Sequence, residues 1–220
     1  MKETSRSILD RLGEQYPALS SCMDDICEMA ERICQCYRRG GKLLICGNGG
    51  SASDALHIVG ELMKSFVLPR EIDRQLEQTL MMGNDEDASY ICENLQGALP
   101  AIALVSEAAL TTAYSNDVAP DMMFAQQVLG YGVAGDVLLG ISTSGNSRNV
   151  ILAAKVARAK GLQTLSLTGM GGGKLKAVSD VTVAVPERET YRVQELHLPV
   201  YHALCLAIEE EFFGKDETRI

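Results

Sequence analysis

Near the N-terminus, apolar residues recur at the spacing of an amphipathic helix. One series has intervals of one, three or four residues: Leu19, Met23, Ile26, Cys27, Ala30, Ile33, Cys34 and Tyr37. These intervals place the side chains on one helix face. Pro17 suits the first turn, and Gly40 and Gly41 end the helix. A shorter apolar set predicts an earlier helix from about residue 5 to 15. Residues 1–39 are therefore predicted to form a helical arm that covers its own domain or another subunit.

After Gly41 the pattern changes to short, continuous apolar runs, each followed by turn-forming residues. These five runs occupy 42–46, 101–106, 137–142, 162–169 and 181–186. Buried strands that alternate with helices predict a parallel sheet with helices on both faces. We therefore predict an α/β fold, a three-layer sandwich around a five-stranded parallel sheet. In such a sheet, binding sites form where loops leave the C-terminal ends of the strands.

Residues 71–100 interrupt this alternation. Arg74 is their only basic residue beside seven acidic ones, and two helix-like pieces, 72–82 and 87–97, flank Gly83 and Asn84. The segment is either an inserted helical excursion or a disordered acidic loop. With no internal repeat, the prediction is one domain over 1–220, with its core at 40–214.

Composition narrows the function classes. The 220 residues carry a formal net charge of −9, which opposes nucleic-acid binding by counterion release. No apolar run approaches the length of a membrane span, and the start of the chain lacks an apolar leader. We expect a cytoplasmic protein with neither a nucleic-acid nor a membrane partner. The seven cysteines mostly lie in apolar patterns, which predicts reduced, buried thiols rather than a structural zinc site.

Two loops at predicted strand ends carry the candidate chemistry. Residues 47–52, GNGGSA, formally match a dinucleotide fingerprint, but that site also needs an acidic residue at the end of the second strand, about twenty positions on, and here the second predicted strand begins only at Ala101. We therefore expect no nucleotide cofactor. The loop still offers N–H groups at a helix N-terminus, which suit a small anion.

The second loop, 142–147, is rich in hydroxyl groups. Its hydroxyl residues are Ser142, Thr143, Ser144 and Ser147. One helix cap uses fewer hydroxyls than this. We interpret the excess as a cradle for a phosphate monoester, and ordinary turn chemistry is the alternative.

Two polar positions in a predicted helix are candidates for acid–base work. His57 and Glu61 are four residues apart, which places them on one helix face just beyond the first loop. A carboxylate beside a histidine near an anion site favours a functional role over a structural one. His202 lies in the last long helix.

Gln194 shares that last helix with His202. The two are about 12 Å apart along a straight axis, so they bracket a site only loosely. Pro199 either kinks this helix or marks its start, which would bring Gln194 closer. By the same periodicity, His197 faces elsewhere.

Segments 46–62, 135–161, 167–175 and 192–202 resemble the sugar isomerase (SIS) superfamily and, within it, the phosphoheptose isomerases. The resemblance implies a flavodoxin-like fold and interconversion of sedoheptulose 7-phosphate and D-glycero-D-manno-heptose 7-phosphate. It implies a catalytic acid–base pair of Glu61 and His202. In metal-bearing members, the zinc ligands match His57, Glu61, Gln194 and His202. The phosphate-binding serines match Ser51, Ser142, Ser144 and Ser147. The residues that line the sugar match Asn48, Asn116 and Asp117, and Gly49, Gly50, Thr143 and Gln194 complete the candidate substrate site.

The resemblance also implies a homotetramer with sites between subunits. The chain departs from the family at Gly60, where many members have a second acid, at Tyr191, where some have an aspartate, and in the insertion. Two alternatives therefore stay open. One is a non-catalytic phosphosugar-binding or protein-binding module of the replication-initiator-associating type, and the other is an isomerase for a different sugar phosphate.

Overall fold

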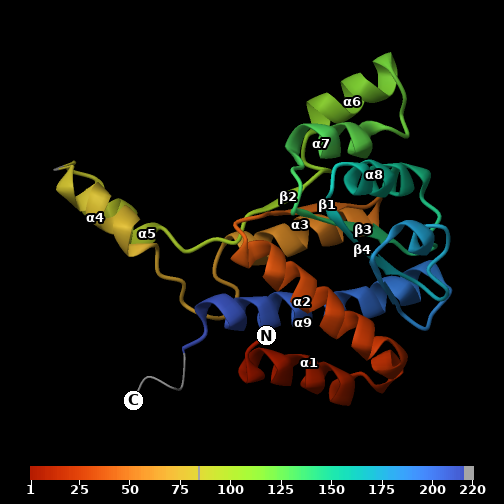
Figure 1. Ribbon diagram of the computed structural model, residues 1–220, viewed down its shortest axis with the longest axis horizontal. Coiled ribbons are helices and arrows are strands. Elements are labelled where there is room, and N and C mark those ends of the chain that lie inside the picture. The colour runs from red at the N-terminus through yellow and green to blue at the C-terminus, as the bar shows by residue number, and fades with distance from the viewer. Residues whose placement is uncertain (84, 216–220) are drawn as a thin grey trace.

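A five-stranded, all-parallel sheet in the order β2-β1-β3-β4-β5 forms the centre of the molecule (Figure 1). The computed structural model describes residues 1–83 and 85–215. The strands are β1 (Leu43–Cys46), β2 (Ala101–Ala103), β3 (Val137–Ser142), β4 (Gln163–Thr168) and β5 (Val181–Ala184). The α/β prediction is confirmed. The run predicted as a strand over 101–106 pairs only as far as Ala103, because the chain turns at 104–106.

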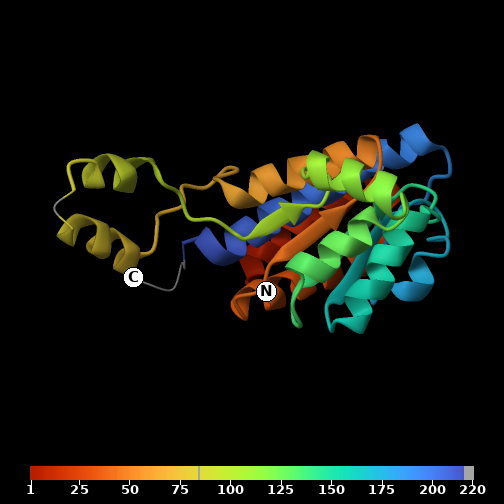
Figure 2. The same ribbon diagram turned by 90° about the horizontal axis from the view of Figure 1, so that it is seen from above.

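Helices cover both faces of the sheet (Figures 1 and 2). One face packs against α2 (Met23–Arg38), α3 (Gly50–Met63) and α9 (Thr190–Phe213), and the other against α7 (Met123–Tyr131) and α8 (Arg148–Ala159). A further helix, α6 (Ala108–Asp117), packs on α7. Successive residues of β1 alternate between the two cores, as the period of a strand requires: Leu43 and Ile45 face one, Leu44 and Cys46 the other.

The N-terminal arm lies against its own domain. Helix α1 (Glu3–Gln15) packs on α9 and buries Leu9 and Leu12. The long helix predicted to start near Pro17 instead starts at Met23, and Pro17–Cys22 form a 3₁₀ helix (η1). The reason is local, because tighter 3₁₀ turns often precede an α-helix. A second 3₁₀ turn, η2 (Lys176–Val178), precedes β5.

The insertion is a helical hairpin that projects from the body (Figures 1 and 2). It consists of α4 (Arg74–Met82) and α5 (Ala88–Asn94), whose only buried residue is Ala88. At its base the Gly97 N–H donates to the Arg70 carbonyl over 3.0 Å. The helical interpretation therefore holds over the disordered one, while Asn84, predicted in the turn, lies outside the described residues.

The sheet order places a topological switch between β1 and β3. From β1 the chain continues to β2 on one side, whereas β3, β4 and β5 extend the sheet on the other. Cys46 pairs with Gly140, so the loops after β1 and β3 leave the same edge of the sheet. This crevice is where doubly wound sheets bind ligands.

The cysteines behave as the sequence predicts. All seven are free thiols. Burial raises the pKa of Cys46 and of Cys205 to about 12, which keeps these two protonated at neutral pH. In the part of the chain that the structure describes, no helix combines the length and the apolar character needed to cross a membrane.

Candidate functional site

The loop after β1 brings glycine backbone and a buried serine to the start of α3. Gly49 has φ +57°, a conformation that favours glycine, and Ser51 is buried. The side chains of Asn48 and Asn149 exchange two hydrogen bonds, of 2.9 and 2.8 Å. Because Asn149 belongs to α8, these bonds tie the first loop to the helix that follows the second. The two predicted loops are therefore neighbours.

The hydroxyl-rich loop after β3 is ordered by its own side chains. The hydroxyls of Ser142 and Ser147 lie 2.9 Å apart, and Ser144 Oγ accepts from the Asn146 N–H over 3.2 Å. Gly145 has φ +64° and packs against the glycine segment after β4, residues 171–173. A Cβ added at Gly145 would lie 2.0 Å from the Gly172 carbonyl oxygen. This loop is therefore held close to the glycine segment.

A recess of about 410 Å³ opens beside this loop. It is lined by Thr143, Ser144, Asn146, Met170, Gly171, Gly173, Glu187 and Arg188. Hydroxyls, an amide and one arginine are groups that donate hydrogen bonds to an anion. Of the predicted phosphate contacts, Ser144 lines this recess, and Ser142 and Ser147 lie in the same loop.

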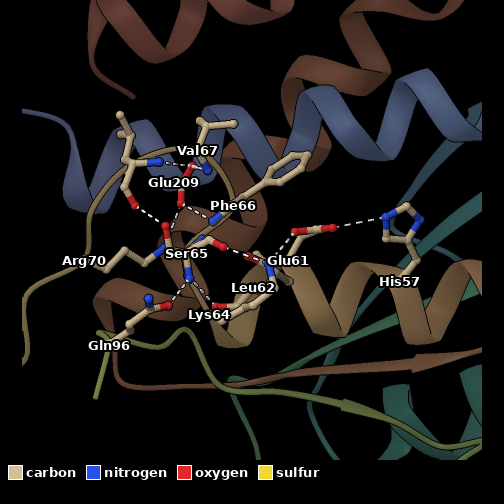
Figure 3. Close-up of polar contacts among 11 residues, drawn as sticks. His57, Glu61, Leu62, Lys64, Ser65, Phe66, Val67, Arg70, Gln96 and Glu209 are labelled. Carbon is tan, nitrogen blue, oxygen red and sulfur yellow. Dashed lines mark hydrogen bonds and ion pairs between the residues drawn. The ribbon is translucent and has the colours of Figure 1, made fainter. Parts of the chain in front are cut away.

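The predicted acid–base residues form a second cluster, on α3 and α9. His57 Nε2 lies 3.1 Å from Glu61 Oε1, and the rings of His57 and His202 are 5.0 Å apart between centroids. Figure 3 shows the His57 ring directed at the Glu61 carboxylate. On the other side, Lys64 Nζ lies 3.4 Å from Glu61 Oε2. The structure thus brings together His57, Glu61 and His202.

Tyr201 belongs to this cluster and was missed by the sequence analysis. Its hydroxyl lies 3.0 Å from His57 Nδ1, so when His57 donates from Nε2 to Glu61, Tyr201 donates to Nδ1. Tyr201 also lies beside Asp54, whose pKa is raised chiefly by burial. The one signal in the sequence that could have identified Tyr201 was its place directly before His202, a predicted catalytic residue.

Burial and the charge of the neighbouring His57 lower the pKa of His202, and Glu61 opposes this shift. His202 is therefore neutral near pH 7. Its Nε2 is buried and has no hydrogen-bond partner among the residues that the structure describes. A neutral imidazole with a free nitrogen can exchange a proton with a substrate oxygen.

Three predicted site residues lie apart from this cluster. The Gln194 side chain covers the first loop, where a Cβ on Gly50 would lie 2.3 Å from Gln194 Nε2. Helix α9 runs unbroken through Pro199, so Pro199 does not mark its start. Asn116 and Asp117 end α6 and hydrogen-bond each other over 2.9 Å.

The four proposed zinc ligands are not assembled within one chain. Across residues 1–83 and 85–215, no three His, Cys, Asp or Glu side chains are grouped so that they could hold a metal ion. His57 and Glu61 are adjacent, but Gln194 contacts Gly50 instead. As arranged in a single chain, these residues do not fit a zinc ion.

The two candidate anion-binding loops, 47–52 and 142–147, are also separated from Glu61. Glu61 lies eleven residues after Gly50, about 16 Å along α3 at the rise of an α-helix. One ligand reaches both only if it extends along the helix or if another copy supplies one of the parts.

Comparison with known proteins gives a consistent result. The SIS domain family matches residues 91–169. Phosphoheptose isomerase from Akkermansia muciniphila is 36% identical over 215 residues, which cover 97% of this chain and 100% of that protein. The structure of phosphoheptose isomerase from Neisseria gonorrhoeae aligns with a TM-score of 0.71 and 36% identity, over 92% of this chain and 93% of that one. A phosphoheptose isomerase from Francisella tularensis aligns with a TM-score of 0.73 and 28% identity, over 94% of both chains. The similarity spans nearly the full length of both partners, and the chain belongs to the phosphoheptose isomerase family.

Proposed function

We propose that this protein is an aldose–ketose isomerase that interconverts sedoheptulose 7-phosphate and D-glycero-D-manno-heptose 7-phosphate. The observation that carries the proposal is the side-chain cluster of His57, Glu61 and His202 in a chain of this family. A fold alone does not determine a function, whereas an acid–base cluster in a chain that also carries candidate anion-binding loops supports a specific chemistry.

The reaction moves a carbonyl group between C1 and C2 of the sugar. Glu61 removes the proton from the carbon next to the carbonyl while the carbonyl oxygen takes up a proton, which gives a cis-enediol. Glu61 then returns its proton to the neighbouring carbon as the other oxygen loses its proton. His202 exchanges the proton between the two oxygens, for which its neutral state at pH 7 is suited. His57 holds the Glu61 carboxylate in place through the 3.1 Å contact.

The two loops hold the phosphate at the other end of the substrate. Ser51, Ser142, Thr143, Ser144 and Ser147 supply hydroxyls, and Gly49 and Gly50 allow close approach of backbone N–H groups at the start of α3. In this proposal the sugar contacts Asn48 and Gln194, which lie at the first loop.

The site is completed by a second copy of the chain. Glu61 and the anion loops are about 16 Å apart along α3, so we propose a homo-oligomer, a tetramer as in the family resemblance, with sites between copies. Asn116 and Asp117 reach the sugar if a neighbouring copy brings α6 to the site. Leu56 and Met63 leave an apolar stripe exposed beside His57 for such a contact.

Zinc is a competing proposal, because a Glu61 carboxylate that binds zinc would not be a free base for the sugar. His57 and Glu61 present a nitrogen and an oxygen donor, the types that zinc prefers, whereas His202 and Gln194 would have to move or come from another copy. Metal analysis of the purified protein, with turnover measured before and after chelation, tests it. Stoichiometric zinc whose removal lowers turnover supports the site, and full turnover by metal-free protein overturns it.

The isomerase proposal is tested by turnover of sedoheptulose 7-phosphate. Glu61→Gln keeps the shape of the side chain but not its basicity, so we expect turnover to be abolished and binding retained. Glu77→Gln, on the exposed face of α4, is the matched control and keeps full activity. Turnover by the Glu61→Gln variant contradicts the mechanism. If the wild-type protein binds sedoheptulose 7-phosphate but does not convert it, the result supports the non-catalytic module that Gly60 and Tyr191 favour.

A further inference from the structure

A buried ion pair lies at the end of the helix that carries Glu61 (Figure 3). Arg70 Nε and Glu209 Oε1 are 2.8 Å apart, and both side chains are 0% exposed. Glu209 also accepts hydrogen bonds of 2.8, 2.9 and 3.2 Å from three successive backbone N–H groups, those of Phe66, Val67 and Leu68. The carboxylate and the guanidinium are therefore both paired and hydrogen-bonded, as buried charges must be.

The remaining N–H groups of Arg70 hold the main chain of Glu61. Arg70 Nη2 donates to the Glu61 carbonyl over 2.8 Å, and Nη1 donates to the Leu62 carbonyl over 2.6 Å. Both carbonyls belong to the last turn of α3, where no intrahelical N–H is available to them. A cation at a helix C-terminus is favourable, and the planar guanidinium can bond several acceptors at fixed angles.

Glu209 connects this arrangement to the other half of the acid–base cluster. It follows His202 by seven residues on α9, which is about two helical turns, so the two side chains point to similar sides of the helix. The pair thus links the peptide of Glu61 on α3 to the helix that carries His202. A buried ion pair adds little stability compared with apolar packing, so stability alone gives a weak reason for its presence here.

We propose that Arg70, held by Glu209, is a positioning residue for the isomerase reaction. Arg70 bonds the Glu61 carbonyl and is itself anchored to α9 through Glu209. It thereby fixes the position of the Glu61 carboxylate relative to His202. This role rests on the proposed function. It requires no contact between Arg70 and substrate, and it predicts a defect in the chemical step rather than in substrate binding.

The test compares Arg70→Lys with the wild type and with a matched variant. Lysine keeps the charge but has a compact ammonium in place of the planar fork, so it does not reproduce the fixed angles at which Arg70 bonds Glu209 and the two carbonyls. We expect kcat for sedoheptulose 7-phosphate to fall about ten- to a hundred-fold, since small displacements of a reacting group have effects of this size. KM should stay within about two-fold, because the anion loops are untouched.

Asp136→Asn is the matched control. Asp136 is 1% exposed and pairs with Lys42 over 2.6 Å, but it lies at the start of β3, at the opposite edge of the sheet from the loops. It should lower the melting temperature as Arg70→Lys does and leave kcat unchanged. If Arg70→Lys does not fold, Glu209→Gln, which keeps the side-chain shape, takes its place with the same expected result.

The outcomes separate this role from the function on which it rests. An inactive wild-type protein overturns the proposed function, and the positioning role falls with it. If the wild type is active and Arg70→Lys and Asp136→Asn change kcat by the same factor, or leave it unchanged in both, the positioning role alone is overturned. A kcat loss confined to the Arg70 and Glu209 variants supports it.

Discussion

Single contacts in the structure define which residues can be tested without unfolding the protein. Gly50 begins α3, and a Cβ there would lie 2.3 Å from Gln194 Nε2, the far end of a flexible side chain. Gly50→Ala should therefore fold and displace Gln194. If Gln194 and the first loop bind the substrate as proposed, KM for sedoheptulose 7-phosphate rises several-fold while the melting temperature stays near that of the wild type.

Gly60→Ala is the control for this variant. Gly60 lies on the same helix and a Cβ there meets nothing within 4 Å, so KM should not change. Equal KM values for Gly50→Ala, Gly60→Ala and the wild type would show that Gln194 has no part in binding.

His197 gives a prediction about pH. It is fully buried, and burial lowers its pKa from 6.5 to about 4. The native state therefore favours neutral His197, whereas the unfolded chain protonates it below about pH 6.5. This contribution to stability is complete above pH 6.5 and is lost as the pH falls from 6.5 towards 4, by roughly 3 kcal/mol.

The pH prediction is checked by chemical denaturation of the wild type and of His197→Leu between pH 7 and pH 4. The free energy of unfolding of the variant should fall less steeply with decreasing pH than that of the wild type. Parallel curves for the two proteins would rule out His197 as the source of this pH dependence.

The sequence predicted residue contacts that a helix enforces and missed those made by tertiary packing. His57 and Glu61 are four residues apart on one helix, so their 3.1 Å contact follows from periodicity. Tyr201 reaches His57 across 144 positions, and Arg70 reaches Glu209 across 139. No local pattern encodes such pairs, because they exist only once α3 and α9 are packed together.

At the scale of elements, the α4–α5 hairpin has few contacts with the rest of the described structure. It buries only Ala88, and its two ends are joined by the bond between Gly97 and Arg70. Replacing residues 74–94 by a short glycine–serine linker removes almost no core, so the melting temperature of the monomeric unit should change by no more than about 3 °C, as expected for a free-energy change below about 1 kcal/mol.

Thermal unfolding of the shortened protein, together with its turnover, checks this prediction. A drop of ten degrees or more would mean that the hairpin is stabilised by contacts that a single chain does not make. The same weak burial explains why the sequence left this segment open between helix and disorder. The strands were predictable because buried parallel strands are continuously apolar, and β3 is buried at all six positions.

At the scale of the whole molecule, one chain holds the parts of the proposed site at a distance from one another. The anion loops lie at the C-terminal edge of the sheet, and the acid–base cluster lies farther along α3 and α9. This separation was not predictable from the sequence, because motif matches give no distance between motifs. Because of this separation, the proposed function includes assembly of several copies, with the site shared between them.

The exposed stripe on α3 is where this assembly can be tested. Leu56 and Met63 are 49% and 45% exposed and lie two turns apart, so they share one side of the helix beside His57. A charge placed there would be desolvated in an interface but harmless on a free surface. Leu56→Lys should therefore reduce the mass measured by light scattering and lower turnover in the same proportion.

Leu129→Lys makes the same chemical change on α7, where Leu129 is 54% exposed on the opposite layer of the sandwich. Its mass and turnover should equal those of the wild type. A monomeric wild type with full turnover would contradict the shared site. So would a Leu56→Lys variant that keeps both the mass and the turnover of the wild type, since the apolar stripe would then face solvent in the active enzyme.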